Sequence, residues 1–325
     1  MPLSTNEQTN KTASELVETM RGAFSTPPQF RPAHARGILL QGTFTPTPIA
    51  RELSSAEHFT APSTSVIVRF SNSTGLPQIP DNASDANPHG MAVRFLLPDD
   101  AQTGRRRHTD IIAHSTPYFP VRTGEMFLDL LHAIGASSKP DAPKNPSPIE
   151  EYLSKTPSAA TFVNAPKPTP ASFATEKYFG VNAIKLVAAD GKPTFVRYRI
   201  VPDAGVSHLS ADEAAAKDPA FLHNEIQTRV IDGGASFTLT AQVAEPEDPT
   251  DDATVLWPEE RRVVNLGTIR VDGVVEDNDE KQRTIIFDPV PRIKGVEPSD
   301  DPLLDMRAAV YLISGKQRRE AGGYH

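Results

Sequence analysis

Residues 237–243 read Phe-Thr-Leu-Thr-Ala-Gln-Val, an alternation of apolar and polar side chains at every position. This period of two is typical of an antiparallel strand that buries one face and leaves the other polar. The same alternation occurs at 194–200, where arginines separate the apolar side chains. Shorter strand-like runs bounded by turn residues lie at 37–43, 65–70, 90–97, 263–271 and 284–287. Together these runs predict one sheet or barrel of antiparallel strands.

Helical patterns surround these strands. Thr12 and Glu15 form a capping-box pattern, which predicts a helix that begins at Thr12 and ends before Pro27. The spacing of apolar residues predicts further helices at 123–133 and 302–319. Residues 135–175 are rich in Pro, Ser, Ala and Lys, and we expect an irregular segment there. Because the elements do not alternate as βαβ units, we expect an α+β fold, a single barrel or sheet with attached helices.

Composition narrows the classes of function. The chain of 325 residues contains no cysteine, which excludes disulfide scaffolds, iron–sulfur clusters, zinc ribbons and thiolate-ligated haem. Its 33 basic and 41 acidic residues give a net charge of −8, which disfavours nucleic acid as a partner. No apolar stretch approaches the roughly 18 residues of a membrane span. The N-terminus lacks the layout of a secretory signal, so we expect a cytoplasmic protein without a membrane span.

Two residues of the predicted C-terminal helix suggest metal chemistry. Arg307 and Tyr311 are four residues apart, and therefore lie on one face of the helix. A guanidinium beside a phenol favours the ionised phenolate, which is the form of tyrosine that ligates ferric iron. The competing interpretation is an ordinary helix surface, so other motifs have to decide between the two.

Seven short motifs follow one another along the chain. They are RPAHARG at 31–37, VRFS at 68–71, HGMAVRF at 89–95, STPYF at 115–119, FDP at 287–289, GVEPS at 295–299 and RAAVY at 307–311. In this order they resemble the motifs of haem catalases, and the resemblance covers about residues 31–319. It implies a catalase-like antiparallel β-barrel with attached helices, and haem bound between the barrel and the C-terminal helix. We expect an N-terminal helix or arm at 1–30 and a single haem-binding domain at 31–325.

The resemblance also implies roles for individual residues. Tyr311, beside Arg307, would ligate the iron of haem b, since catalases use a tyrosine axial ligand. His34 would be the distal acid–base group, with its ring fixed by Ser71. The positions that match haem-binding residues are Arg31, Arg69 and Arg318, for the propionates, and Phe119 and Phe127, for the pocket wall. His114 stands where the family has a distal asparagine, and it either faces the haem or turns away.

The expected activity follows from this resemblance. The chain ends six residues after Arg319, as in the small catalase-related peroxidases. We expect a haem peroxidase that reduces hydrogen peroxide or an organic hydroperoxide with a small organic electron donor. Catalase activity should be weak or absent, because the distal asparagine is replaced. A hydroperoxide-rearranging enzyme like allene oxide synthase and a low-turnover haem-binding or sensing protein remain alternatives. A monomer or homodimer is expected.

Overall fold

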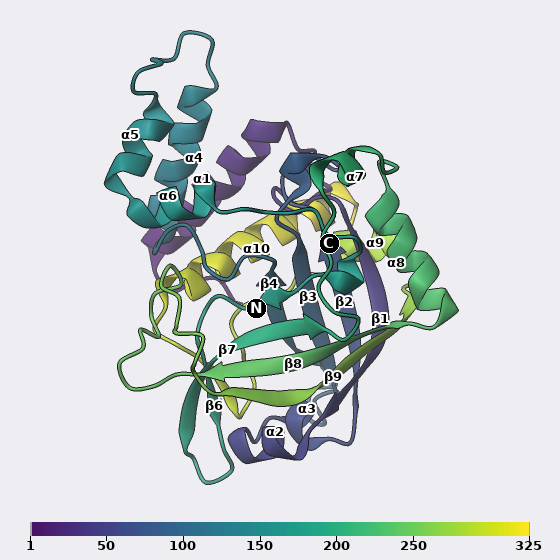
Figure 1. Ribbon diagram of the computed structural model, residues 1–325. Helices are drawn as coiled ribbons and strands as arrows, with labels where there is room; N and C mark the ends of the chain where they lie inside the picture. The colour runs from purple at the N-terminus through teal and green to yellow at the C-terminus, as the bar shows by residue number, and fades with distance from the viewer. Residues whose placement is uncertain (1, 325) are drawn as a thin grey trace.

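The computed structural model describes residues 2–324, in which ten strands form one antiparallel sheet that curls into a barrel (Figure 1). The strands are β1 (Gly37–Pro46), β2 (Thr64–Ser71), β3 (Gly90–Leu97), β4 (Arg107–His114), β5 (Tyr178–Phe179), β6 (Ile184–Val187), β7 (Pro193–Pro202), β8 (Ala235–Val243), β9 (Val263–Val274) and β10 (Val296–Pro298). Their spatial order is β10-β6-β7-β5-β4-β3-β2-β1-β9-β8, and β8 pairs again with β7. This second pairing closes the barrel and leaves no free edge between β7 and β8.

The alternation at 237–243 becomes strand β8 of the barrel. Phe237, Leu239 and Ala241 are fully buried in the barrel interior, where the ring of Phe237 lies 5.9 Å from that of Phe70 on β2. Burial of each large apolar side chain contributes about 1.5–3 kcal/mol. The predicted α+β class and the antiparallel barrel are therefore confirmed.

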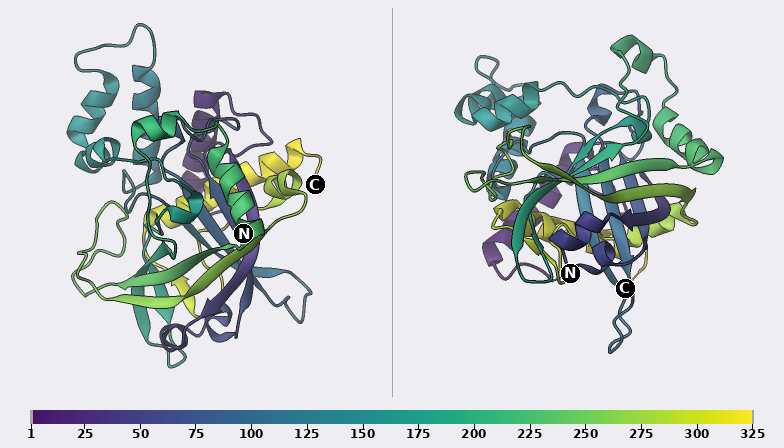
Figure 2. Two further views of the ribbon diagram at one scale, coloured as in Figure 1. Left: turned by 45° about the vertical axis from the view of Figure 1, so that its right-hand side comes forward. Right: turned by 60° about the horizontal axis from the view of Figure 1, so that its bottom comes forward.

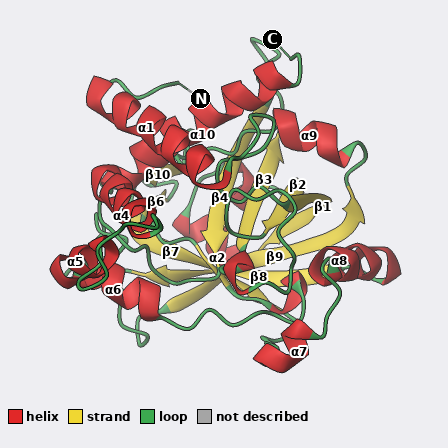
Figure 3. Cartoon of the chain, turned by 90° about the horizontal axis from the view of Figure 1, so that it is seen from above, coloured by secondary structure: helices red, strands yellow, loops and turns green. Residues whose placement is uncertain are grey.

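Helices lie on several sides of the barrel (Figure 3). Those of residues 2–324 are α1 (Glu7–Phe24), α2 (Pro48–Leu53), α3 (Glu57–Thr60), α4 (Gly124–Ser137), α5 (Pro148–Lys155), α6 (Pro157–Asn164), α7 (Ala211–Ala215), α8 (Phe221–Asp232), α9 (Asn278–Thr284) and α10 (Pro302–Ala321), with 3-10 turns at Ser84–Ala86 and Phe173–Thr175. Helices α2 and α3 lie at the opposite end of the barrel from α1 and α4 (Figure 1). Helices α1, α4 and α10 pack together through Leu16, Met20, Leu128 and Met306. Helices α4 to α6 extend away from the barrel, as does the loop between β3 and β4 (Figures 1 and 2). The proposed boundary between 1–30 and 31–325 stays a prediction, and residues 1 and 325 lie outside the described chain.

The first helix begins earlier than the sequence pattern predicts. Helix α1 starts at Glu7, because the side chain of Asn6 accepts hydrogen bonds from the backbone of Gln8 and Thr9. Thr12 lies inside the helix, and its hydroxyl contacts Glu125 of α4 at 3.3 Å. The prediction of a helix start at Thr12 is wrong because Asn6 supplies the cap.

Two other segments also differ from the prediction. Residues 135–175 contain helices α5 and α6, each of which begins with a proline at its first position, where the missing N–H has no cost. Residues 284–287 do not form the predicted strand, since helix α9 ends at Thr284 and no strand pairs with the residues that follow. Phe287 instead packs under the guanidinium of Arg94, 5.1 Å from its ring centre. The prediction missed β4, which includes His114.

Candidate active site

A large cavity lies between helices α1, α4 and α10 and strands β2, β3 and β4. The volume of this cavity is about 250 Å³. The structure brings all ten predicted site residues to its wall: His34, Ser71, His114, Arg31, Arg69, Phe119, Phe127, Arg307, Arg318 and Tyr311. The cavity therefore collects groups from nearly the whole length of the chain.

One wall is formed by helix α10. The helix begins after Asp301, whose side chain caps it by accepting from the backbone N–H of Leu303 at 2.9 Å. One turn apart on this helix, Arg307 donates from Nη2 to the Tyr311 hydroxyl at 3.4 Å. The guanidinium and the phenol therefore meet on one face of the helix, as the four-residue spacing predicts.

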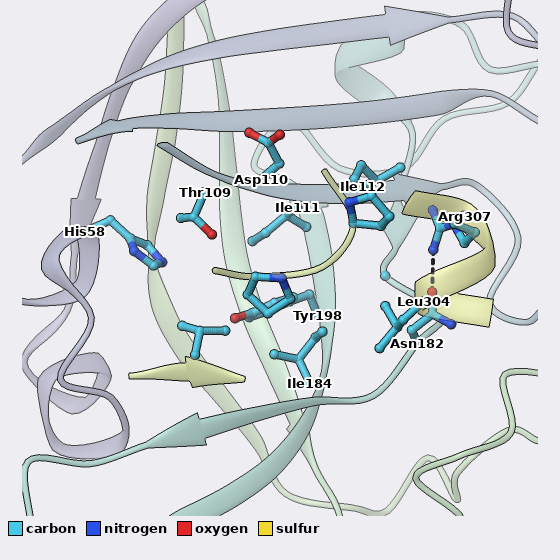
Figure 4. Close-up of a pocket in the computed structure, with 14 residues that line it drawn as sticks. His58, Thr109, Asp110, Ile111, Ile112, Asn182, Ile184, Tyr198, Leu304 and Arg307 are labelled. Carbon is cyan, nitrogen blue, oxygen red and sulfur yellow. Dashed lines mark hydrogen bonds between the residues drawn. The ribbon is translucent and has the colours of Figure 1, made fainter. Parts of the chain in front are cut away.

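Two residues that the sequence motifs did not reveal hold Arg307 in place. Asn182, in the loop before β6, accepts a hydrogen bond from Arg307 (Figure 4) and donates one to Asp301 at 2.8 Å. Burial raises the pKa of Asp301, although the bond from Asn182 opposes that rise. Asp301 could have been recognised as a helix cap before Pro302, whereas nothing in the local sequence marks Asn182.

The opposite part of the wall contains His34, which precedes β1. Its Nδ1 lies 3.1 Å from the hydroxyl of Ser71 at the end of β2. Gly90 pairs with Ser71 in the neighbouring strand, and a Cβ at Gly90 would come within 2.8 Å of the Ser71 hydroxyl and 3.1 Å of His34 Nδ1. The glycine thus makes the room in which this imidazole and hydroxyl meet. Burial, followed by the charge of Arg69, lowers the pKa of His34 to about 4, so the ring is neutral near pH 7.

His114 is among the residues that line the same cavity, and whether its ring faces a bound haem stays a prediction. The backbone N–H of Thr116 donates to His114 Nδ1 at 3.3 Å, and the Thr116 hydroxyl lies 2.5 Å from the same atom. Because a backbone N–H can only donate, Nδ1 accepts and the neutral ring carries its proton on Nε2. That Nε2 is buried without a partner in the described chain, and burial lowers the pKa of the ring to about 3. His114 therefore presents a neutral N–H donor.

One end of the cavity is strongly cationic. Arg31, Arg69 and Arg318 line it, and their hydrogen bonds go to backbone carbonyls and to the side chains of Gln282 and Ser314, not to carboxylates. Burial and the neighbouring guanidinium groups lower the pKa of each arginine, that of Arg69 to about 9. Nε of Arg318 is buried without a partner in residues 2–324. An anionic group at this end would offset the repulsion among the three guanidinium groups and could accept a hydrogen bond from Arg318 Nε.

The remainder of the cavity wall is largely apolar. The rings of Phe119 and Phe127 lie 5.2 Å apart and contribute to it, together with Leu16 of α1 and Met306 of α10. A flat apolar group with an anionic edge would match such a lining. Among the helices of residues 2–324, none has the length and apolar character needed to cross a membrane.

Comparison with known proteins agrees with this geometry. The catalase family matches residues 28–323. A catalase-related peroxidase of Mycolicibacterium paratuberculosis is 36% identical over 310 residues, covering 94% of this chain and 95% of that protein. Another from Synechococcus elongatus is 29% identical over 313 residues, covering 95% and 89%. A catalase of Pseudomonas syringae pv. syringae is 30% identical over 313 residues, covering 90% of this chain and 58% of that protein.

A crystal structure of a fungal catalase shares the fold. It superposes with a TM-score of 0.75 at 20% sequence identity and covers 89% of this chain and 59% of the fungal chain. The chain spans about three fifths of the lengths of these two catalases, but nearly the whole of the two catalase-related peroxidases.

The chain belongs to the catalase family of haem-dependent oxidoreductases that act on peroxide. Within this family, the two relatives that it covers almost completely are named catalase-related peroxidases. The cavity fits haem by its own chemistry, since it offers an arginine-supported phenol, a neutral imidazole, an apolar lining and unpaired arginines for two carboxylates.

Proposed function

We propose that this chain is a haem b peroxidase that reduces hydrogen peroxide or organic hydroperoxides with electrons from a small organic donor. We further propose that its catalase activity, the oxidation of a second hydrogen peroxide, is weak or absent. The main support is the distal side of the cavity, where His34 and His114 are both neutral and both project from fixed backbone. The two imidazoles can accept and donate protons. The site lacks the distal amide that the resemblance to catalases would lead one to expect.

We assign the metal side of the cavity to Tyr311. Its phenol oxygen would hold the iron, and Arg307 would donate a hydrogen bond to that oxygen. Asn182 and Asp301 act as positioning residues, because they fix the guanidinium from the other side. Arg31, Arg69 and Arg318 would bind the haem carboxylates, while Phe119 and Phe127 would pack against the ring. A bound haem would supply an iron at which a hydroperoxide could be reduced.

His34 performs the proton transfer in this proposal. The Ser71 hydroxyl accepts from Nδ1–H, which leaves the lone pair of Nε2 free to take the proton of a hydroperoxide. The same nitrogen then returns that proton to the departing oxygen, so that water or an alcohol leaves in place of an anion. A pKa of about 4 keeps the ring neutral, and therefore able to accept, across the physiological range.

His114 supplies a hydrogen bond to the substrate. Nδ1 is engaged by Thr116, so the Nε2–H, which has no partner in residues 2–324, is the group that would donate to the hydroperoxide. A donor in a fixed position can bind one oxygen of the hydroperoxide while His34 takes the proton from it. An imidazole reaches further than an amide and so narrows the space beside His34. We infer that this disfavours a second hydrogen peroxide and leaves reduction to a donor that acts from outside the distal pocket.

The test compares two activities of the haem-loaded protein in the same buffer. Oxygen release from hydrogen peroxide measures catalase activity, and oxidation of a phenolic donor such as guaiacol measures peroxidase activity. We expect donor oxidation to dominate, and His114→Asn to shift the ratio toward oxygen release. Dominant oxygen release by the unmodified protein would refute the proposal.

Two other outcomes would support different functions. Formation of a rearranged product from a lipid hydroperoxide, without donor consumption, would favour an allene oxide synthase-like reaction. Absence of turnover with any donor would favour a haem-binding or sensing protein. A cytoplasmic location and a monomeric or homodimeric state also remain proposals, which fractionation and light scattering would test.

A further inference from the structure

A second, much smaller cavity lies next to the large one, and Arg307 and Ile112 line both (Figure 4). Its other lining residues come mainly from β4, β6, β7 and the loop before β10, with His58 from α3. Its volume is about 30 Å³, and one water needs roughly 10–15 Å³ of such space. The cavity thus suits about two water-sized molecules and is too small for a cofactor.

His58 marks one end of this barrel cavity. Its side chain is 2% exposed and lies against Phe59 and Phe95, with ring centroids 4.0 and 4.6 Å away. Burial lowers the pKa of the imidazole to about 3, so the ring is neutral. Its Nδ1 has no hydrogen-bond partner in residues 2–324. A buried polar atom left unpaired costs free energy, which a small hydrogen-bonding molecule would recover.

Two buried hydroxyl groups face the same end. Tyr198 is 6% and Thr109 is 7% exposed, and Figure 4 shows the Tyr198 hydroxyl directed toward His58. The hydrogen bond drawn among the lining residues joins Arg307 to Asn182, and none joins His58, Thr109 and Tyr198 to one another. Each hydroxyl can donate one hydrogen bond and accept others. This end therefore offers several donors and acceptors with no net charge.

Arg307 marks the other end. A guanidinium has five N–H donors, and Arg307 uses one toward Asn182 and one toward Tyr311. Arg307 lines the barrel cavity as well as the large cavity. Asp110 also borders the barrel cavity, but its carboxylate is paired with Arg94 at 2.7 Å and is not available to attract a cation. The site is thus suited to neutral acceptors.

We propose that the barrel cavity binds one or two neutral hydrogen-bonding molecules of the size of water. Tyr198, Thr109 and His58 hold them at one end, and they accept from the remaining N–H groups of Arg307 at the other. Water and hydrogen peroxide share this chemistry. The occupant solvates the guanidinium that faces Tyr311 without entering the large cavity. This site does not depend on the proposed peroxidase activity, because each of its contacts is made by the protein.

A crystal structure of the haem-loaded protein, at a resolution that shows ordered water, tests the proposal directly. We expect density within hydrogen-bonding distance of the Tyr198 hydroxyl and of an Arg307 nitrogen. Crystals of His34→Ala, which should consume peroxide far more slowly, are then soaked in hydrogen peroxide. Elongated density would mean that the site also takes peroxide, and unchanged separate peaks would identify water alone. A cavity without density in both crystals would overturn the proposal.

Unfolding measurements provide an independent test. Tyr198→Phe removes a hydroxyl and little volume. If the hydroxyl is bound to an ordered molecule, the variant loses those hydrogen bonds, and the melting temperature should fall by a few degrees. If the cavity is dry, removal of an unpaired hydroxyl should leave the melting temperature unchanged or raise it, which would contradict the proposal. Ile184→Val is the matched control, because it shortens an apolar side chain of the same wall without touching a hydrogen bond.

Discussion

The two walls of the large cavity are built in different ways. On the helical wall, Arg307 and Tyr311 meet because they are four residues apart in α10. The barrel wall instead collects His34, Ser71, Gly90 and His114 from four separate segments. Ser71 pairs with Gly90, and Gly90 pairs with His114, so three of them form one row across neighbouring strands. A slip of one residue in either pairing would move a member of this row to the other face of the barrel.

The helical wall predicts the largest single effect. Tyr311→Phe removes the oxygen that we propose as the iron ligand but keeps the ring. The variant should fold. It should either bind less than one haem per chain or bind haem with an altered absorption spectrum. The spectrum of the purified protein and its haem content check this. An unaltered ferric tyrosinate-type spectrum would mean that another residue holds the iron.

The barrel wall should control turnover without controlling haem binding. His34→Ala removes the proposed proton acceptor, and general acid–base catalysis is typically worth about 10²–10⁴-fold. We expect kcat to fall within that range while the absorption spectrum stays close to that of the unmodified protein. Single-turnover and steady-state kinetics with hydrogen peroxide measure the loss. Comparable kcat in the two proteins would remove His34 from the mechanism.

The cross-strand row itself can be disturbed at Gly90. In Gly90→Ala the new methyl would come within 2.8 Å of the Ser71 hydroxyl and 3.1 Å of His34 Nδ1. Misplacement of a supporting group typically costs about 10–100-fold in activity, and strain from overpacking costs about 1–3 kcal/mol of stability.

Gly135→Ala is the control for this change. Gly135 lies in helix α4, and no neighbouring atom lies within 4 Å of the position that the alanine methyl would take. The variant should therefore gain up to about 1 kcal/mol of stability. Activity should be unchanged. Equal behaviour of the two alanine variants in kinetics and urea unfolding would show that the row tolerates a side chain.

A further prediction concerns the dependence of stability and activity on pH. Burial lowers the pKa of His34 to about 4 and that of His114 to about 3, from an ordinary value of 6.5. At pH values between these folded-state pKa values and 6.5, the two imidazoles bind protons in the unfolded chain but not in the folded chain. The free energy of unfolding should therefore fall as the pH falls below 6.5. The acid limb of kcat/KM should likewise centre near pH 4. A midpoint near 6.5 would show that His34 titrates as an exposed imidazole.

Residue patterns were sufficient wherever structure is local. The alternation at 237–243 predicts β8 because successive side chains of a strand point to opposite faces. The Arg307 and Tyr311 pair follows from helix geometry alone. The prediction of helix boundaries failed where a residue outside the recognised pattern began the helix. Asn6 took the cap that Thr12 was expected to provide, and prolines began α5 and α6 in a segment expected to be irregular.

The sequence by itself determined the antiparallel barrel, the pairing of Arg307 with Tyr311 on one helix face, the absence of thiolate chemistry and, through ordered motifs, the family. Only the tertiary structure decided that His114 lines the large cavity, that Asn182 links Arg307 to Asp301, and that a polar cavity adjoins this arginine inside the barrel. The physical reason is distance along the chain. Residues within one turn of helix or one strand have their relative positions set by the backbone, whereas contacts across more than a hundred residues depend on strand register and packing.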